Sequence, residues 1–307
     1  MRAARLRRSV AVLISAVAFS FPPAPAVAHT APRPHATASY GTTAPVRHIA
    51  LQGAVNVRDL GGYRTERDRH VRYGQVFRSD GLGRLTDSDV VRLSRLGLRT
   101  VVDFRVPQEV RGDGADRLPT GPAVTSRPVQ DRGLYATTME VIGSRDPVKQ
   151  RDVLGDGKAA KLMRSIYRAF VTDPGDRRAF AETLRDIAHH RRTPLLYHCT
   201  SGKDRTGWLS YVLLRAVGVP AATAERDYLL SNDFRAAADL RVREGLKQSG
   251  LMQDPDLLVP LQEVRPDYLG AALDQAERDY GGLHGYLTRG LGLGAAELAG
   301  LRARLVR

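Results

Sequence analysis

The sequence contains a single cysteine, Cys199, among 307 residues. One cysteine cannot form an intramolecular disulfide, and it cannot supply the several thiolates of a zinc-cysteine cluster. A lone cysteine is most often a small buried apolar residue. The residues around Cys199 therefore decide whether it has a chemical role.

Long apolar runs are also absent, apart from one short stretch at 10–21. This stretch is shorter than the roughly 20 residues that a transmembrane helix needs. It follows a start with four arginines and precedes Ala26-Val27-Ala28, where a signal peptidase could cut. These parts predict a signal peptide over 1–28 and a secreted or extracytoplasmic protein. Sec and twin-arginine export both stay open, and a signal anchor is the alternative.

Lysine is scarce, because only five of the 47 basic residues are lysine and the rest are arginine. The formal net charge is +14, and it falls to about +10 once the four arginines of 1–28 are removed (14 − 4). Codon bias towards arginine accounts for much of this charge, although a basic surface also attracts phosphorylated or lipid anions. We expect no nucleic-acid partner. Contact with an anionic membrane surface stays open, and no oligomeric state is indicated.

Composition divides the chain into three parts. Residues 29–45 are rich in Pro, Ala and Thr without an apolar period, which predicts a flexible linker after the signal peptide. From residue 46 to 307 the pattern is that of one folded domain.

The first part of that domain predicts a β-α-β unit. Residues 73–78 and 100–105 have strand character, and a helix is expected between them. Thr86 suits the start of this helix, and Gly97 suits its end. A β-α-β unit implies a parallel pair of strands.

The rest of the domain predicts mainly helices around the sheet. Residues 112–157 carry many Gly, Pro, Asp and Arg residues, so we expect a long connection over the sheet and a candidate lid. A short apolar strand is expected at 194–198, followed by a helix at 206–217 that is buried around most of its circumference. Further helices are expected at 158–171, 177–190, 221–231, 233–249, 266–280, 283–291 and 295–305. The predicted fold is α/β, with a central mostly parallel sheet flanked by helices and a helical C-terminal region.

The loop between that strand and that helix carries Cys199. Its sequence is His198-Cys199-Thr200-Ser201-Gly202-Lys203-Asp204-Arg205-Thr206-Gly207. A phosphate monoester needs an ionised nucleophile, hydrogen-bond donors for its oxygens and a fixed cation. A cysteine at a helix N-terminus beside cations favours the thiolate.

Five residues between Cys199 and Arg205 are enough to curl the backbone around one tetrahedral anion. Their N–H groups would then bind phosphate. The candidate phosphate-binding residues are Thr200, Ser201, Gly202 and Lys203 from this stretch, together with Thr206 just after Arg205.

Individual side chains of this loop also have expected roles. Gly202 permits tight curvature, and Arg205 can hold two phosphate oxygens in a bidentate fork. The Thr206 hydroxyl is placed to donate to the Cys199 sulfur. His198 is expected to orient the loop through hydrogen bonds rather than to act as a base.

The His-Cys-five-residues-Arg-Thr pattern resembles the protein tyrosine phosphatase superfamily. The Lys203-Asp204 pair resembles its bacterial secreted branch, which includes mycobacterial and listerial phosphatases. The likeness extends to other segments: Asn56-Val57-Arg58-Asp59-Leu60-Gly61-Gly62-Tyr63, Phe77-Arg78-Ser79-Asp80 and Asp103-Phe104-Arg105. It implies a cysteine-phosphatase fold with a catalytic domain over 46–307.

The resemblance also implies residue roles and substrates. Cys199 would be the nucleophile, Arg205 the phosphate clamp and Asp204 the general acid, with Asp80 and Asp103 as competing acids. The substrates would be phosphotyrosine proteins, with phosphoserine, phosphothreonine and phosphoinositides as further substrates, and no metal or cofactor would be used. Lys203 would suit multiply phosphorylated headgroups, or else be a solvated lysine.

Other assignments remain open at this point. Four polar residues are expected to be structural and to link the first turn to the sheet and the loop: Asn56, Arg58, Asp59 and Arg105. A secreted module that binds phosphate or phosphoinositide without hydrolysis is the alternative function, and sulfur transfer from a persulfide is a weaker one.

Overall fold

The computed structural model describes residues 47–307. The predicted signal peptide and linker, 1–28 and 29–45, lie outside these residues. Within residues 47–307 the sheet has six strands in the order β1-β2-β3-β6-β4-β5. The strands are β1 Arg47–His48, β2 Arg58–Asp59, β3 Val76–Ser79, β4 Thr100–Asp103, β5 Ala123–Ser126 and β6 Leu195–His198.

The centre of the sheet is parallel, as predicted. β3, β6, β4 and β5 run in one direction, whereas β1 and β2 form an antiparallel edge. The expected direct pairing of 73–78 with 100–105 is wrong, because β6 lies between β3 and β4 and pairs with both. All four residues of β6 are buried, and a strand buried in this way needs a neighbour on each side.

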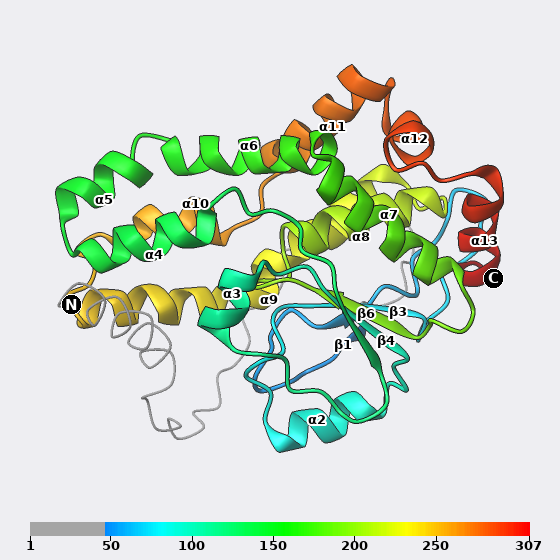
Figure 1. The fold of residues 1–307 in the computed structure, drawn as a ribbon, viewed down its shortest axis with the longest axis horizontal. Helices are drawn as coiled ribbons and strands as arrows, with labels where there is room; N and C mark the ends of the chain where they lie inside the picture. The colour runs from blue at the N-terminus through cyan, green and yellow to red at the C-terminus, as the bar shows by residue number, and fades with distance from the viewer. Residues whose placement is uncertain (1–46) are drawn as a thin grey trace, which may run out of the picture.

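Helices cover both faces of the sheet (Figure 1). The helices up to β6 are α2 Asp87–Ser94, α3 Pro107–Asp113, α4 Leu134–Ser144, α5 Pro147–Leu154, α6 Lys158–Thr172 and α7 Pro174–Ala188. Those after it are α8 Arg205–Ala216, α9 Ala221–Gln248, α10 Val259–Gln262, α11 Pro266–Tyr280, α12 Leu283–Gly285 and α13 Ala295–Leu305, with a 3-10 turn η1 Pro255–Leu258 and a π-helical turn η2 Tyr286–Gly290. None of these helices is long and apolar enough to cross a membrane.

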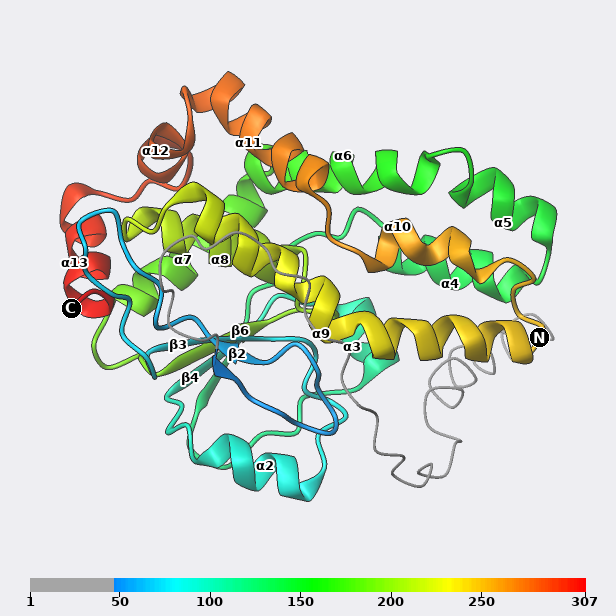
Figure 2. The ribbon, with the colours of Figure 1, turned by 180° about the vertical axis from the view of Figure 1, so that it is seen from behind.

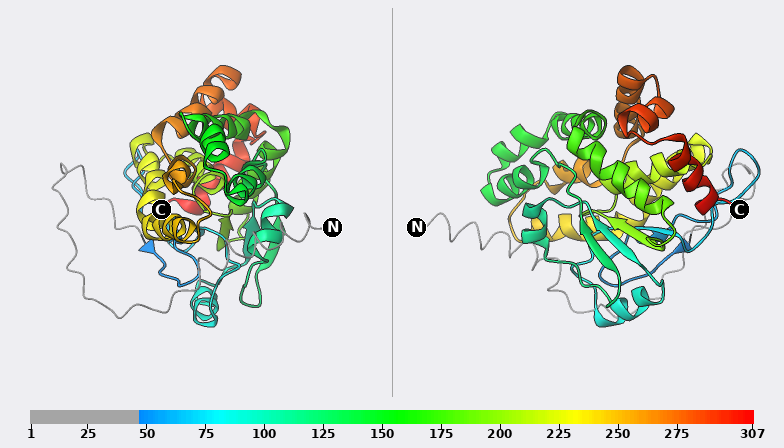
Figure 3. Two further views of the ribbon diagram at one scale, coloured as in Figure 1. Left: turned by 90° about the vertical axis from the view of Figure 1, so that its left-hand side faces the viewer. Right: turned by 45° about the vertical axis from the view of Figure 1, so that its right-hand side comes forward.

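The strand β6 divides its side chains between two cores. Leu195 and Tyr197 join the large core beneath α7 and α8, whereas Leu196 joins the smaller core beneath α2. Figure 3 shows the sheet between these two layers of helices. Alternation of side chains along a strand produces this division.

The helix α2 begins and ends for local reasons that the sequence contains. The Thr86 hydroxyl accepts from Asp89 N, and the Asp89 carboxylate accepts from Thr86 N, which is a capping box. After Ser94 the chain turns, and Gly97 has a φ of +59°. The predicted helix between the two strands is confirmed.

The predicted long connection at 112–157 is wrong, because this segment contains β5, α4 and α5. Its few apolar residues, such as Val141 and Leu154, pack against Leu246 and Leu258 from much later in the chain. Periodicity within the segment is weak because its helices are stabilised by these distant contacts.

The predicted pair of helices at 221–231 and 233–249 is also wrong, since both belong to the single helix α9. The far half of α9 projects beyond the sheet together with α4, α5, α6 and α10 (Figures 1 and 2).

Candidate active site

The loop that carries Cys199 joins the central strand β6 to the buried helix α8. Cys199 follows directly after the last residue of β6 and is only 1% exposed. Arg205 is the first residue of α8. The N-terminus of α8 therefore directs its free N–H groups and its positive dipole towards the loop.

Gly202 has the conformation that the sequence predicts for a tightly curled loop. Its φ is +64°, and a Cβ atom at this position would lie 2.4 Å from the carbonyl oxygen of Ser79. Any other residue would be strained and would also collide with the end of β3.

Buried polar side chains fix the outer side of the loop. Nδ2 of Asn56 donates to the carbonyl oxygens of Ser201 and Gly202, at 3.2 and 3.0 Å. Nη2 of Arg78 donates to the same Gly202 oxygen at 2.8 Å. The expected structural role of Asn56 is confirmed.

A fully buried charge cluster supports these contacts. Asp227 on α9 pairs with Arg58 at 2.9 Å and with Arg78 at 2.7 Å. Burial disfavours the carboxylate, yet the two arginines lower the pKa of Asp227 to about 2. The structural role of Arg58 is confirmed, whereas Arg78 and Asp227 had not been assigned a role. An acidic residue far along the chain gave no local signal of this contact.

Arg205 is held by a carboxylate that sequence reasoning missed, Glu109. Nη1 and Nη2 of Arg205 donate to Glu109 at 2.6 and 2.5 Å, and the Thr200 hydroxyl donates to Glu109 at 2.6 Å. Burial opposes ionisation of Glu109, but the hydrogen bonds and charge of Arg205 hold its pKa below the usual range. Glu109 lies just beyond β4, at the same carboxyl edge of the sheet as Cys199, which is the available signal.

The charge balance around Arg205 favours its cationic form. Burial lowers its pKa, but the Cys199 sulfur, Glu109 and Asp204 raise it above its usual value. No hydrogen bond within residues 47–307 uses Nε of Arg205. The guanidinium therefore binds Glu109 through its two terminal nitrogens, Nη1 and Nη2. The edge formed by Nε and Nη2 can still donate to another oxyanion.

Asp204 is surrounded by donors. Nζ of Lys203 contacts its two oxygens at 2.9 and 2.7 Å, and the Tyr167 hydroxyl donates to it at 2.9 Å. The Tyr228 hydroxyl in turn donates to Tyr167 at 2.8 Å. Burial and the nearby charge of Asp204 raise the pKa of Tyr167 well above its usual value, so Tyr167 remains a neutral donor.

Lys203 is not a solvated lysine. Its side chain is buried, and Nζ also donates to the carbonyl oxygen of Glu263 at 3.3 Å. The alternative interpretation of Lys203 as a surface residue is therefore wrong, because burial and two partners fix its ammonium group.

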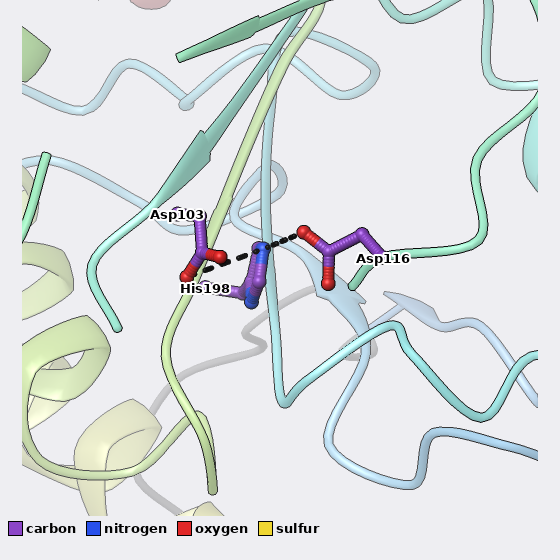
Figure 4. Close-up of side chains that lie close together, drawn as sticks. All are labelled: Asp103, Asp116 and His198. Carbon is purple, nitrogen blue, oxygen red and sulfur yellow. Dashed lines mark hydrogen bonds and ion pairs between the residues drawn. The ribbon is translucent and has the colours of Figure 1, made fainter. Parts of the chain in front are cut away.

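His198 lies between two carboxylates at the end of β6 (Figure 4). Nε2 is 2.9 Å from Asp116 and 3.8 Å from Asp103, and the other ring nitrogen is 3.4 Å from the Cys199 carbonyl oxygen. This placement fits an orienting role. The three side chains are close enough to share a metal ion. However, Nη2 of Arg105 already contacts both carboxylates at 2.8 and 2.7 Å and supplies the positive charge there.

The remaining predicted residues occupy distinct positions. The Thr206 hydroxyl is buried and has no hydrogen-bond partner within the described residues, so its expected bond to the Cys199 sulfur is not formed. Asp59 accepts from Gly61 N and Gly74 N, which confirms a structural role. Asp80 accepts from two backbone N–H groups, and Asp103 pairs with Arg105, so both competing acids are engaged in structural contacts.

A cleft of about 260 Å³ adjoins the loop at Thr200 and Ser201. Its walls come from the segment before β2, the β3–α2 connection, the end of α3 and the middle of α9. Its charged lining residues are Asp80, Arg84, Arg105, Asp113, Arg235 and Arg241.

A cysteine after the central parallel strand and an arginine at the start of the next buried helix define a cysteine-dependent phosphatase. The chain belongs to the tyrosine phosphatase family, whose family model matches residues 49–307. It is 31% identical over 277 residues to the triple specificity protein phosphatase PtpB of Mycobacterium tuberculosis, covering 83% of this chain and 98% of that protein. It is 27% identical over 237 residues to a tyrosine-protein phosphatase of Nostoc commune, covering 74% of this chain and 73% of that one.

The crystal structure of TpbA from P. aeruginosa in complex with phosphotyrosine aligns with 76% of this chain and 99% of its own. The sequence identity is 17% and the TM-score is 0.28, which is too low to support an argument. The assignment to a protein-tyrosine phosphatase therefore rests on the sequence relatives and the family model.

Proposed function

We propose that the chain hydrolyses phosphotyrosine in proteins through a phosphocysteine intermediate on Cys199. One observation supports this most directly: the thiol of Cys199, the guanidinium of Arg205 and the carboxylate of Asp204 belong to one loop at the β6–α8 junction. The N–H groups of this loop and of the α8 N-terminus would bind the phosphoryl oxygens.

The reaction takes two steps. The Cys199 thiolate attacks phosphorus, the bond from phosphorus to the tyrosine oxygen breaks, and Asp204 donates a proton to the leaving oxygen. Water then attacks the phosphocysteine while Asp204 accepts a proton, and the sulfur–phosphorus bond breaks to restore the thiolate. Because Thr206 has an unused buried hydroxyl, this group is available to the sulfur as it leaves.

The side chain of Arg205 is prepared for the transition state. Glu109 occupies Nη1 and one side of Nη2, which fixes the plane of the guanidinium. The Nε edge then offers two parallel donors to the equatorial phosphoryl oxygens. Lysine at this position would keep the charge and lose the fork.

Phosphoserine, phosphothreonine and phosphoinositides belong to this proposal as further substrates. The support is the sequence similarity to a relative named for triple specificity. Lys203 no longer supports lipid headgroups, since its ammonium is bound to Asp204 and Glu263. We also propose that the enzyme acts outside the cytoplasm, on the basis of the N-terminal sequence, and that its basic charge permits contact with anionic membrane surfaces.

The test is phosphate release by residues 29–307 from a phosphotyrosine peptide, a phosphoserine peptide and a phosphoinositide. Cys199→Ser should abolish release, and Asp204→Ala should lower kcat by about 10²–10⁴-fold, as loss of a general acid does. Tight binding of the same ligands by reduced protein without release would instead establish the binding-module function. Full turnover by Cys199→Ser would exclude the phosphocysteine route.

Export needs a separate measurement. A reporter enzyme that is active only outside the cytoplasm should become active when fused after residues 1–45, and inactive when 1–28 are deleted. Activity of the deleted fusion would contradict the signal-peptide prediction.

A further inference from the structure

The phosphate-binding loop is covered on one side and open on the other. On the covered side, Lys203 is 2% exposed and bound to the chain at Glu263, and Tyr167 of α6 lies against Asp204. On the other side, Thr200 and Ser201 line the cleft. If the proposed function holds, the part of the substrate that surrounds the phosphorylated residue lies in this cleft.

Two arginines of the cleft, Arg105 and Arg235, form ion pairs that support the site. Arg105 pairs with Asp103 at 2.8 Å and with Asp116 at 2.7 Å. Arg235 pairs with Asp239 at 2.5 Å and lies 3.6 Å from Asp80, and its Nη1 donates to the Ser201 carbonyl oxygen. These two arginines support the loop and the cleft wall.

The other two arginines lie at the solvent side of the cleft. Arg84, on the β3–α2 connection, and Arg241, on α9, are both exposed. Within the part of the chain that the structure describes, Arg241 has no hydrogen-bond or ion-pair partner. An exposed arginine on the wall of a substrate cleft is suited to bidentate recognition of an oxyanion.

Two acidic residues, Asp80 and Asp113, also line the cleft and would repel an oxyanion that binds Arg241. The carboxylate of Asp80 accepts from Val55 N and Asn56 N, both at 3.0 Å, and lies 3.6 Å from Arg235. Burial raises the pKa of Asp113, although the charge of Arg84 works in the other direction.

We propose that Arg241, together with Arg84, selects phosphotyrosine peptides that carry an acidic side chain close to the phosphotyrosine. The phosphotyrosine would occupy the loop while the neighbouring aspartate or glutamate pairs with Arg241 in the cleft. This inference names the substrate class for the proposed function and rests on it.

A peptide fits the surface better than a membrane does. The exposed large apolar side chains of the described residues are Val91, Val124, Val148 and Leu240, and they come from four different elements. Docking on a lipid surface through this cleft would require a continuous apolar or aromatic rim that could enter the bilayer boundary. Of these four side chains only Leu240 is next to Arg241 in the chain, so they do not form such a rim around the cleft.

The experiment compares kcat/KM for two phosphotyrosine peptides that differ only in two flanking residues, glutamate in one and glutamine in the other. We expect the wild-type enzyme to prefer the acidic peptide by about three- to tenfold, and the preference to shrink in 0.5 M salt, because rim charges are screened. Arg241→Ala should remove most of this preference.

The matched control is Arg226→Ala, which removes an exposed arginine from the same helix 15 residues earlier. At 1.5 Å per residue this position is about 22 Å away along the helix. Arg226→Ala changes the net charge by the same amount as Arg241→Ala but lies away from the cleft, so the preference for the acidic peptide should remain. Loss of the preference in both variants would show a general charge effect and overturn the assignment to Arg241.

Reversing the charge at residue 241 is the most decisive test. Arg241→Glu should prefer a peptide with flanking lysines over the acidic peptide, which a merely structural role would not produce. Equal turnover of all peptides by the wild-type enzyme would overturn this inference while leaving the phosphatase function intact. No turnover of any peptide would refute the proposed function itself. If Arg241→Ala lowered hydrolysis of phosphoinositide vesicles but left peptide preference unchanged, the cleft would serve lipid headgroups instead.

Discussion

Gly202 shows how one residue determines the shape of the loop. Gly202→Ala combines a positive φ with a Cβ that would lie 2.4 Å from the Ser79 carbonyl oxygen, so the loop must move. We expect a loss of more than about 3 kcal/mol in unfolding free energy or a displaced loop, and in either case a large fall in kcat.

The control for this change is Gly74→Ala. Gly74 also has a positive φ, +72°, but nothing lies within 4 Å of the added Cβ. Strain alone should cost about 1 kcal/mol there, with normal activity. Urea unfolding and kcat for both variants check the prediction, and equal effects of the two substitutions would show that contact with Ser79 is unimportant.

Tyr167 is a positioning residue for Asp204 rather than a group that touches substrate. Tyr167→Phe removes the hydroxyl that donates to Asp204 at 2.9 Å. Because the lost donor helps to hold the carboxylate in place, we expect kcat at neutral pH to fall by about three- to tenfold, with KM nearly unchanged.

Tyr211→Phe provides the comparison for this experiment. Tyr211 is also buried, but it packs on Trp208, and its hydroxyl has no hydrogen-bond partner within the described residues. Removal of the Tyr211 hydroxyl should leave kcat and KM unchanged. An unchanged kcat in Tyr167→Phe would mean that Lys203 alone orients Asp204.

At the scale of elements, one carboxylate connects α9 to the sheet. Asp227 pairs with Arg58 on β2 and Arg78 on β3, and Arg78 reaches the catalytic loop. Asp227→Asn leaves two buried arginines without a counter-charge, so we expect a loss of about 3–5 kcal/mol in unfolding free energy. Loss of activity should accompany partial unfolding of this region.

The ion pairs of Asp227 with the two arginines also predict how the free energy of unfolding depends on pH. The folded pKa of Asp227, about 2, is below its ordinary value of 3.8. Its ionisation therefore contributes about 2 kcal/mol above pH 4, and this contribution is lost as the pH falls from 4 towards 2. Urea unfolding between pH 3 and pH 7 should show a smaller acid loss in Asp227→Asn than in the wild type. Equal acid losses would contradict the assignment.

At the scale of the whole molecule, the single cysteine determines the response to oxidants. Peroxide should convert the Cys199 thiolate to sulfenic acid while the peroxide is reduced to water, and activity should be lost. No second cysteine exists to trap this form as an intramolecular disulfide. Added thiol should therefore restore activity after brief exposure, and prolonged exposure should make the loss permanent.

Mass spectrometry of Cys199 together with activity checks this prediction. A matched sample with phosphate bound should lose activity more slowly, since the anion occupies the loop. Full activity in protein whose Cys199 is oxidised would contradict both the prediction and the role of the thiol.

The catalytic loop could be predicted because its signals are local. The spacing from Cys199 to Arg205, the glycine at Gly202 and the adjoining apolar strand and helix lie within about 20 consecutive residues. The capping box of α2 and the parallel centre of the sheet were predictable for the same reason: short-range patterns determine helix ends and buried strands.

Tertiary structure decided what depends on residues far apart in the chain. Asp227 and Tyr167 reach the site only because α9 and α6 meet at one edge of the sheet, and nothing next to them in the sequence indicates this. For Glu109 the available signal was only its place just beyond β4. The insertion of β6 between β3 and β4 and the helices within 112–157 have the same origin. By itself the sequence determined the nucleophile, the clamp and the curl of the loop, since local backbone and helix-end physics produce them. The partners that orient these groups, and the arginines of the cleft, were decided by packing between distant elements, because burial and charge pairing act only once the chain is folded.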